Sequence, residues 1–156
     1  MRTQGRWRVA ALLGAIMAAS VFGPWAAAAS AGEAMPGHYL DIDITNQVLS
    51  NVVDGQVDWS AHISTGNEEW FWTEAGWTLA HTPRGWSEVY WRDPGWAESE
   101  LGWLYDAIYF NGPFAIHGSN SVPYYPASHG CVRVSLEDAE WLFARIEYGT
   151  PVLVHD

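Results

Sequence analysis

The residues best suited to chemistry lie in the last third of the chain. Its single cysteine, Cys131, stands two positions after His129 with Gly130 between them, and His117 follows a short apolar stretch upstream. A thiol becomes a strong nucleophile when it is held as a thiolate, and a nearby histidine is the usual means of holding it so. These residue types indicate nucleophilic catalysis, with Cys131 as the candidate nucleophile and His117 as the candidate base on a rigid support.

The main chain around the cysteine is suited to stabilising negative charge. His129 and Cys131 face the same way in extended backbone because they are two positions apart. Gly130 permits unusual dihedral angles and a close approach of substrate to the main chain. We therefore expect the N–H groups of Gly130 and Cys131 to donate to a developing oxyanion.

Other interpretations of these residues stay open at this point. A lone cysteine is also compatible with an inert, buried side chain that packs as a small hydrophobe. A metal site built from His117, His129 and Cys131 is a second alternative, although the chain lacks the helix-borne histidine pair and glutamate base of such sites. Arg133 has a plain alternative role as the partner of a carboxylate such as Asp138.

Strands must supply most of the support for these residues. Residues 39–44 alternate between polar and apolar side chains, which is the pattern of a half-buried strand. Residues 48–53 and 56–63 flank Asp54-Gly55, a dipeptide that favours a two-residue hairpin turn. The sequence therefore predicts a β-rich start to the fold.

A second hairpin is predicted to carry the candidate base. Residues 104–110 and 114–117 are apolar runs on either side of Asn111-Gly112-Pro113. The second run ends at His117, which is followed by a Gly-Ser-Asn loop.

One helix is predicted near the C-terminus, followed by a last strand over residues 152–154. Ser135 is the predicted N-cap, with Asp138 in place of the usual glutamate of a capping box. Gly149 is predicted to end the helix as its C-cap, and Thr150-Pro151 prevents continuation. The apolar stripe at helical spacing comprises Leu136, Ala139, Leu142, Phe143 and Ile146.

The first 31 residues have the order of basic, apolar and small residues that describes a secretory signal peptide. Three arginines precede an apolar run over residues 9–22, and Ala29-Ser30-Ala31 offers a cleavage site. The alternative is an uncleaved anchor, but the run is shorter than the ~20 residues that span a bilayer. We expect export to the periplasm or cell wall, no stable membrane anchor, and one domain over residues 32–156.

The expected domain is strongly acidic. Three of the seven basic residues lie in the first 31 residues and all eighteen carboxylates follow, which leaves four positive against eighteen negative side chains and a net charge of −14. Phosphate binding needs clustered positive charge, so we expect no nucleic acid as a partner.

Tryptophan is concentrated in the middle of the chain. Eight of the eleven tryptophans lie between Trp59 and Trp103, interleaved with glycines and carboxylates. Packing in strands and core is the simple explanation, because aromatic residues favour sheets and bury large areas. A groove lined by some of these rings, against which sugars stack, is the alternative.

The segment Ser128–Arg133, with His117-Gly118 upstream, resembles the signature of the L,D-transpeptidase (YkuD-type) catalytic domain. Residues 63–66 and 82–85 resemble the family's serine-threonine-glycine and threonine-proline-x-glycine stretches, and the resemblance covers nearly all of 38–156. It implies a compact, mainly β domain, a mixed β-sheet or sandwich with one helix near the C-terminus.

The resemblance also implies roles for individual residues. Cys131 matches the nucleophile and His117 the general base, while His129 matches the motif histidine that shapes the site. Gly130 matches the glycine that supplies oxyanion backbone. The residues expected on the substrate side are Ser128, Arg133, Gly118, Ser119 and Tyr125, the last from a short, proline-flanked loop that we expect to form a stiff wall.

The implied reaction joins peptidoglycan stem peptides without a metal or organic cofactor. The cysteine attacks the bond between the third residue of a tetrapeptide stem and its terminal D-alanine, and a diaminopimelate-type amine then takes the acyl group to give a 3→3 crosslink. An L,D-carboxypeptidase, with water as acceptor, and a non-catalytic glycan-binding module are the alternatives. The sequence assigns no oligomeric state.

Overall fold

The computed structural model describes residues 35–156. The predicted signal peptide lies outside the described residues. No helix within 35–156 is long and apolar enough to cross a membrane. The elements are β1 (His38–Asp43), β2 (Val48–Val53), β3 (Gln56–His62), β4 (Trp70–Thr73), β5 (Gly76–Leu79), β6 (Gly85–Glu88), β7 (Trp91–Ser99), β8 (Gly102–Asn111), β9 (Phe114–Gly118), β10 (Val132–Val134), α1 (Leu136–Phe143) and β11 (Pro151–His155).

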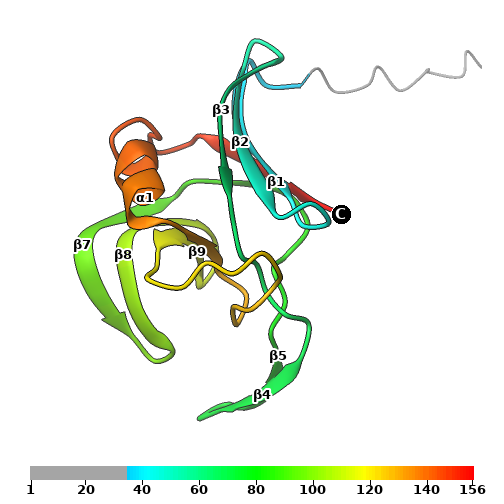
Figure 1. The fold of residues 1–156 in the computed structure, drawn as a ribbon, viewed down its shortest axis with the longest axis vertical. Helices are drawn as coiled ribbons and strands as arrows, with labels where there is room; N and C mark the ends of the chain where they lie inside the picture. Colours follow the sequence, from blue (N-terminus) through cyan, green and yellow to red (C-terminus); the bar gives the residue numbers. More distant parts are fainter. Residues whose placement is uncertain (1–34) are drawn as a thin grey trace, which may run out of the picture. The chain divides into compact units, whose positions relative to one another are not determined.

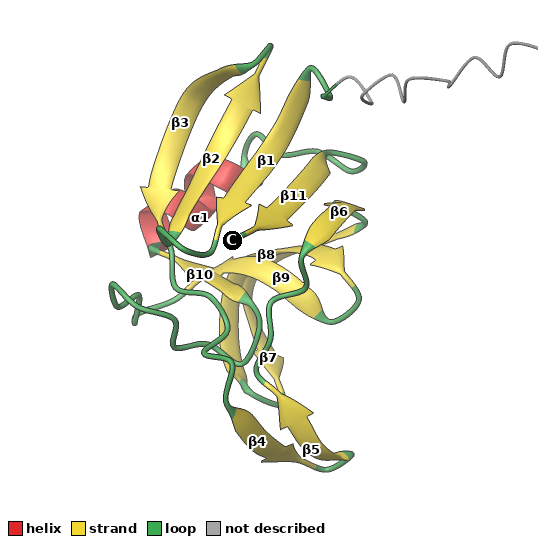
Figure 2. Ribbon diagram, turned by 90° about the vertical axis from the view of Figure 1, so that its right-hand side faces the viewer, coloured by secondary structure: helices red, strands yellow, loops and turns green. Residues whose placement is uncertain are grey.

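The strands form two mixed sheets and a separate hairpin (Figures 1 and 2). One sheet has the order β3-β2-β1-β11-β6 and the other β10-β9-β8-β7, while β4 and β5 pair only with each other. Strand β1 runs parallel to β11, and β9 runs parallel to β10. The predicted mainly β architecture with one helix near the C-terminus is therefore confirmed.

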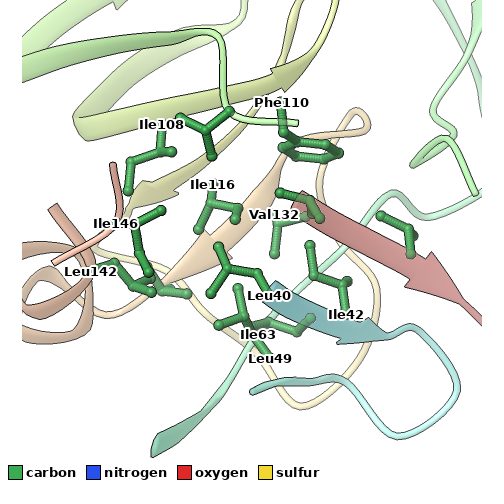
Figure 3. Packing of buried hydrophobic residues seen from close by; sticks show 14 of the residues in the cluster. Leu40, Ile42, Leu49, Ile63, Ile108, Phe110, Ile116, Val132, Leu142 and Ile146 are labelled. Carbon is green, nitrogen blue, oxygen red and sulfur yellow. The ribbon is translucent and has the colours of Figure 1, made fainter. Parts of the chain in front are cut away.

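The hydrophobic core joins both sheets and the helix (Figure 3). Leu40 and Ile42 of β1 meet Ile116 of β9 and Leu142 of α1, all with 1% exposure or less. The cluster thus holds the back of β9 and β10 in place, and the opposite face of these two strands remains for a site.

The predicted hairpin at Asp54-Gly55 is confirmed. Asp54 has φ +49° and Gly55 has φ +74°, the two left-handed residues that a type I′ turn requires. Strands β2 and β3 begin or end within one residue of the predicted bounds.

The helix begins as predicted and ends earlier. Ser135 Oγ accepts a hydrogen bond from the Asp138 N–H at 3.1 Å, which confirms the N-cap. The helix ends at Phe143, so the prediction that Gly149 is its C-cap is wrong. Gly149 instead donates its N–H to the Val89 carbonyl at 2.7 Å, because the chain there must already turn toward β11 beside β1.

Candidate active site

The parallel pairing of β9 and β10 brings the predicted nucleophile and base to one face. His117 is the register partner of Arg133, and Ile116 that of Val132. Ile116 and Val132 point into the core, so by strand alternation His117 and Arg133 point to the opposite face. Cys131, two positions before Arg133, lies on that face as a diagonal neighbour of His117.

A cavity of about 400 Å³ opens on this face. Its floor is formed by the side chains of β9, β10 and the loop that joins them, and two hairpins supply its walls. The floor includes His117, Ser119, Ser128, His129, Cys131 and Arg133. The walls include Phe71, Thr73, Thr78 and Leu79 from β4–β5, and Ser99, Leu101 and Trp103 from the end of β7–β8.

Ser128 fixes the turn that carries the cysteine. Its buried hydroxyl accepts a hydrogen bond from the Gly130 N–H at 2.9 Å and donates one to the Cys131 carbonyl at 2.5 Å. The side chain that we expected on the substrate side therefore closes the Ser-His-Gly-Cys turn on itself. The Gly130 N–H already donates to Ser128 Oγ, so it is not free to donate to an oxyanion as we expected. Of the two N–H groups considered, that of Cys131 remains as the candidate donor.

The position of Gly130 admits glycine alone. Its φ of +130° is rare for residues with a side chain, and a Cβ atom would lie 2.7 Å from the His81 carbonyl oxygen and 2.5 Å from the Phe114 ring. The unusual dihedral angle expected at Gly130 is therefore present, but the atoms that approach its main chain most closely belong to His81 and Phe114 and not to a substrate.

A second layer of buried hydroxyl groups supports the turn. Thr82 Oγ1 accepts a hydrogen bond from the Gly66 N–H and donates one to the Gly130 carbonyl, both at 2.9 Å. The Ser128 N–H donates to the Thr65 carbonyl at 2.9 Å, and the Thr65 N–H donates to Gln47 Oε1 at 2.9 Å. The serine-threonine-glycine and threonine-proline stretches thus anchor the Ser-His-Gly-Cys turn.

His117 is held in the tautomer that a base requires. Its Nδ1 lies 3.0 Å from the Gly118 carbonyl oxygen, which can only accept, so Nδ1 carries the proton and Nε2 keeps its lone pair. Burial lowers the pKa of His117 to about 4, and the nearby Arg133 cation contributes to the lowering. The imidazole is therefore neutral at pH 7.

Cys131 lies beside His117 in an apolar setting. The residue is half-buried and packs against the cluster of Leu104, Ala107 and Ala115. Burial raises the pKa of the thiol, against the lowering effects of an Ala115 main-chain hydrogen bond and of Arg133. Cys131 is therefore a neutral thiol in the resting site, and not the thiolate that we expected, while His117 is a neutral imidazole. The thiol sulfur lies 3.9 Å from the Pro113 carbonyl oxygen.

His129 lines the same cavity but contacts a different element. Its exposed ring packs against Phe71 of β4, with ring centroids 4.5 Å apart. Within residues 35–156, no group of three or more histidine, cysteine or acidic side chains is arranged to hold a metal ion. The motif histidine therefore connects the Ser-His-Gly-Cys turn to the β4–β5 wall.

Arg133 presents a cation to the cavity. Among the described residues its guanidinium forms no ion pair, and Asp138, the carboxylate considered as its partner, accepts instead from the Ser135 hydroxyl at 2.6 Å. Arg133 is thus free to meet a negatively charged group of a substrate.

The remaining predicted substrate-side residues fall into different places. Ser119 lines the cavity next to His117. Gly118 is buried against α1 and does not have room for a side chain. A Cβ atom at this position would lie 3.0 Å from the Cβ atom of Ala139. Tyr125 is 64% exposed on the loop before the turn, and its carbonyl accepts from the Ser64 hydroxyl at 2.8 Å.

Sequence reasoning missed Thr82 and Phe71 as parts of the site. Thr82 belongs to residues 82–85, which resemble the family's threonine-proline-x-glycine stretch, but this resemblance assigns no role to the hydroxyl. A threonine between a histidine and a proline was the available signal. Phe71 gave no signal, because its contact with His129 exists only once the hairpin is folded over the turn.

The chain matches a known protein family. The family model of the L,D-transpeptidase catalytic domain, YkuD, matches residues 37–154. No significant match was found among curated proteins.

Solved structures agree with this match. The chain is similar to an L,D-transpeptidase from Xylanimonas cellulosilytica, with 41% identity, a TM-score of 0.74 and 76% of this chain covered. Similar folds at 24% and 21% identity are those of L,D-transpeptidases from Stackebrandtia nassauensis (TM-score 0.63, 79% of this chain) and Mycobacterium smegmatis (TM-score 0.62, 77%). The chain spans 60%, 57% and 59% of these three structures, less than two thirds of their length. The matched family model and the 41% identity together show that this chain belongs to the L,D-transpeptidase catalytic-domain (YkuD) family.

Proposed function

We propose that this chain is a cysteine-dependent L,D-transpeptidase that forms 3→3 crosslinks in peptidoglycan. The observation that carries the proposal is the shared face of Cys131 and His117 on the floor of a 400 Å³ cavity, beside Arg133, which forms no ion pair within residues 35–156. The cavity is large enough for part of a peptide stem. The apolar start of the chain supports export to the periplasm or cell wall as part of the same proposal.

The first half-reaction starts from the neutral pair. As Cys131 Sγ attacks the carbonyl carbon of the third stem residue, His117 Nε2 takes the thiol proton. The Cys131 N–H donates to the oxyanion that develops on the carbonyl oxygen. The C–N bond to D-alanine then breaks, His117 returns the proton to the leaving amine, and a thioester remains on Cys131.

Arg133 suits the leaving residue. D-alanine carries the free carboxylate of the tetrapeptide, and a guanidinium binds carboxylates through two parallel hydrogen bonds. With Arg133 two residues beyond Cys131 on the same face, this contact orients the scissile bond over the thiol.

The second half-reaction transfers the acyl group. The amine of a diaminopimelate-type residue attacks the thioester carbon, His117 accepts a proton from that amine, and the sulfur leaves and is reprotonated. Water in place of the amine would make the enzyme an L,D-carboxypeptidase, through the same thioester.

Product analysis separates these outcomes. The purified protein is incubated with a tetrapeptide muropeptide, and the products are weighed by mass spectrometry. A dimer lighter than two substrates by one D-alanine is the expected result. A tripeptide alone would replace the proposal with a carboxypeptidase, and unchanged substrate in the presence of confirmed binding would favour a non-catalytic module.

A further inference from the structure

The β4–β5 hairpin has two chemically different faces. Cross-strand partners share a face, and Trp72 pairs with Trp77 while Phe71 pairs with Thr78. Phe71 and Thr78 line the cavity. Trp72 and Trp77 therefore lie on the opposite face of the same two strands, and strand alternation places Trp70, two positions before Trp72, on that face too. Leu79, the partner of Trp70 at the open end of the hairpin, nevertheless reaches the cavity.

These three indoles are exposed. Trp70 is 65% exposed, and Trp72 and Trp77 are each 66% exposed. Trp72 and Trp77 meet edge to face with centroids 5.7 Å apart. Figure 2 shows the hairpin extending away from the two sheets. The exposed fractions of the three rings show that the rest of the described chain leaves most of their surface uncovered. Three large exposed rings on four-residue strands exceed what packing explains.

The charges of the hairpin limit what the face can bind. The hairpin itself, residues 70–79, carries one charged side chain, Glu74, and Glu69 stands just before it, while Glu68 is already paired with Arg84 and His81. Anionic membranes and polyanions attract basic segments, so both are disfavoured here. A neutral ligand with hydroxyl groups suits the face, because its apolar sides stack on indoles and its hydroxyls donate to carboxylates.

The proposed function places such a ligand close by. Three stem residues separate the glycan strand from the scissile bond, and three extended residues span at most about 10–11 Å. A donor stem with its carbonyl at Cys131 therefore brings its glycan strand to the rim of the cavity. The β4–β5 hairpin forms part of that rim, and its two faces are one backbone layer apart.

We propose that Trp70, Trp72 and Trp77 form a glycan-binding surface for the N-acetylated amino-sugar strand that carries the donor stem. This inference rests on the proposed function for the identity of the strand. In this arrangement the inner face of the hairpin contacts the peptide and the outer face holds the sugar. Recognition of the polymer is thereby separated from the chemistry at Cys131.

A neutral sugar probe tests the surface without catalysis. The full chain is titrated calorimetrically with the hexamer of β-1,4-linked N-acetylglucosamine. Trp70→Ala, which leaves the Trp72–Trp77 contact in place, is expected to weaken binding several-fold, up to about 10-fold. Trp86→Ala is the matched control. Trp86 is 46% exposed on β6 in the five-stranded sheet, away from the hairpin, so its removal is expected to leave binding unchanged.

A second readout protects the test against a local folding defect. Trp72→Phe with Trp77→Phe keeps an aromatic pair in the hairpin, and it is expected to lower turnover of a glycan-linked stem relative to that of the free tetrapeptide. Sugar binding by a protein that does not turn over free tetrapeptide supports the inference and contradicts the proposed function.

Three results would overturn the inference. The first is absence of sugar binding by a wild-type protein that does turn over free tetrapeptide. The second is equal weakening by Trp70→Ala and Trp86→Ala. The third is Trp70-dependent binding to phosphatidylcholine vesicles in place of the sugar, which would assign the face to a membrane surface.

Discussion

Arg133 on β10 is the direct register partner of His117 on β9, and both side chains face the cavity with Cys131. One cation therefore acts on both reacting groups. Burial and the Arg133 charge both lower the pKa of His117. Burial raises the pKa of Cys131, and the Arg133 charge partly offsets that rise. In the proposed reaction, proton transfer from the thiol would accompany its attack, and the arginine would favour the thiolate as it forms.

Removal of this cation is expected to make the thiol harder to ionise. In Arg133→Gln the pKa of Cys131 rises further, because a charge that lowers it is lost. The rate of alkylation by iodoacetamide, measured against pH, then has its midpoint at higher pH than in wild type. Arg133→Lys keeps the charge and serves as control. An unchanged midpoint in the glutamine variant would contradict the electrostatic role.

Gly130→Ala is expected to disable the site. The added Cβ meets the His81 carbonyl and the Phe114 ring at a φ of +130°, so the turn must shift and carry Cys131 with it. We expect a loss of at least ~100-fold in acylation, since a displacement of about 1 Å has that effect, and destabilisation of about 1–3 kcal/mol.

Gly55→Ala is the matched control for that substitution. Gly55 also has a positive φ, +74°, but a Cβ there meets nothing within 4 Å. It is expected to lose stability without loss of acylation per folded molecule. Equal acylation by both variants, with folded fractions taken from urea unfolding, would show that Gly130 does not position the nucleophile.

The hydroxyl of Thr82 is expected to matter more than its methyl group. Thr82→Val leaves the buried Gly66 N–H and Gly130 carbonyl without partners, which costs about 1–3 kcal/mol for each group in the free energy of unfolding. Thr82→Ser keeps both hydrogen bonds and is expected to retain most of the stability and the acylation rate. A serine variant as impaired as the valine variant would assign the effect to packing.

The low pKa of His117 predicts how stability depends on pH. The folded-state pKa of about 4 lies below the ordinary 6.5, so between these values the unfolded chain binds the proton first. Stability is therefore lost as pH falls from about 6.5 to about 4, by up to about 3 kcal/mol. Urea unfolding of wild type and His117→Gln at several pH values measures this difference.

His155 provides a control of opposite sign. A main-chain hydrogen bond to Asp156 and the nearby Asp41 and Asp43 raise its pKa, so its contribution is present at low pH and lost as pH rises through the raised value. The stability that wild type has over His155→Gln should therefore decrease as pH rises, whereas the stability it has over His117→Gln should decrease as pH falls. The same pH dependence in His117→Gln as in wild type would contradict a buried, neutral imidazole.

Elements with local turn chemistry were predictable from the sequence. Asp54-Gly55 fixes its hairpin through two residues, and the Ser135 cap needs only Asp138 three positions later. Strand β7 was not predicted, because Pro94-Gly95 in its interior is typical of a turn. The structure accommodates the dipeptide in a bulge, where Asp106 of β8 accepts the Gly95 N–H at 2.7 Å.

The same distinction applies to the site. The Ser-His-Gly-Cys segment and His117 were predicted because the motif is contiguous and the base ends an apolar strand. The contact of Thr82 with Gly130 joins residues 48 positions apart, and no local pattern encodes it. The protonation states were also beyond the sequence, because burial by the fold determines them.

The most direct test of the account is the mass of the protein after a brief reaction with a tetrapeptide muropeptide. Wild type is expected to gain the mass of the substrate minus D-alanine, and peptide mapping should place the adduct on Cys131 as a thioester that hydroxylamine removes. Cys131→Ala, folded as judged by urea unfolding, should gain no mass. An adduct of the same mass on the alanine variant would contradict the account.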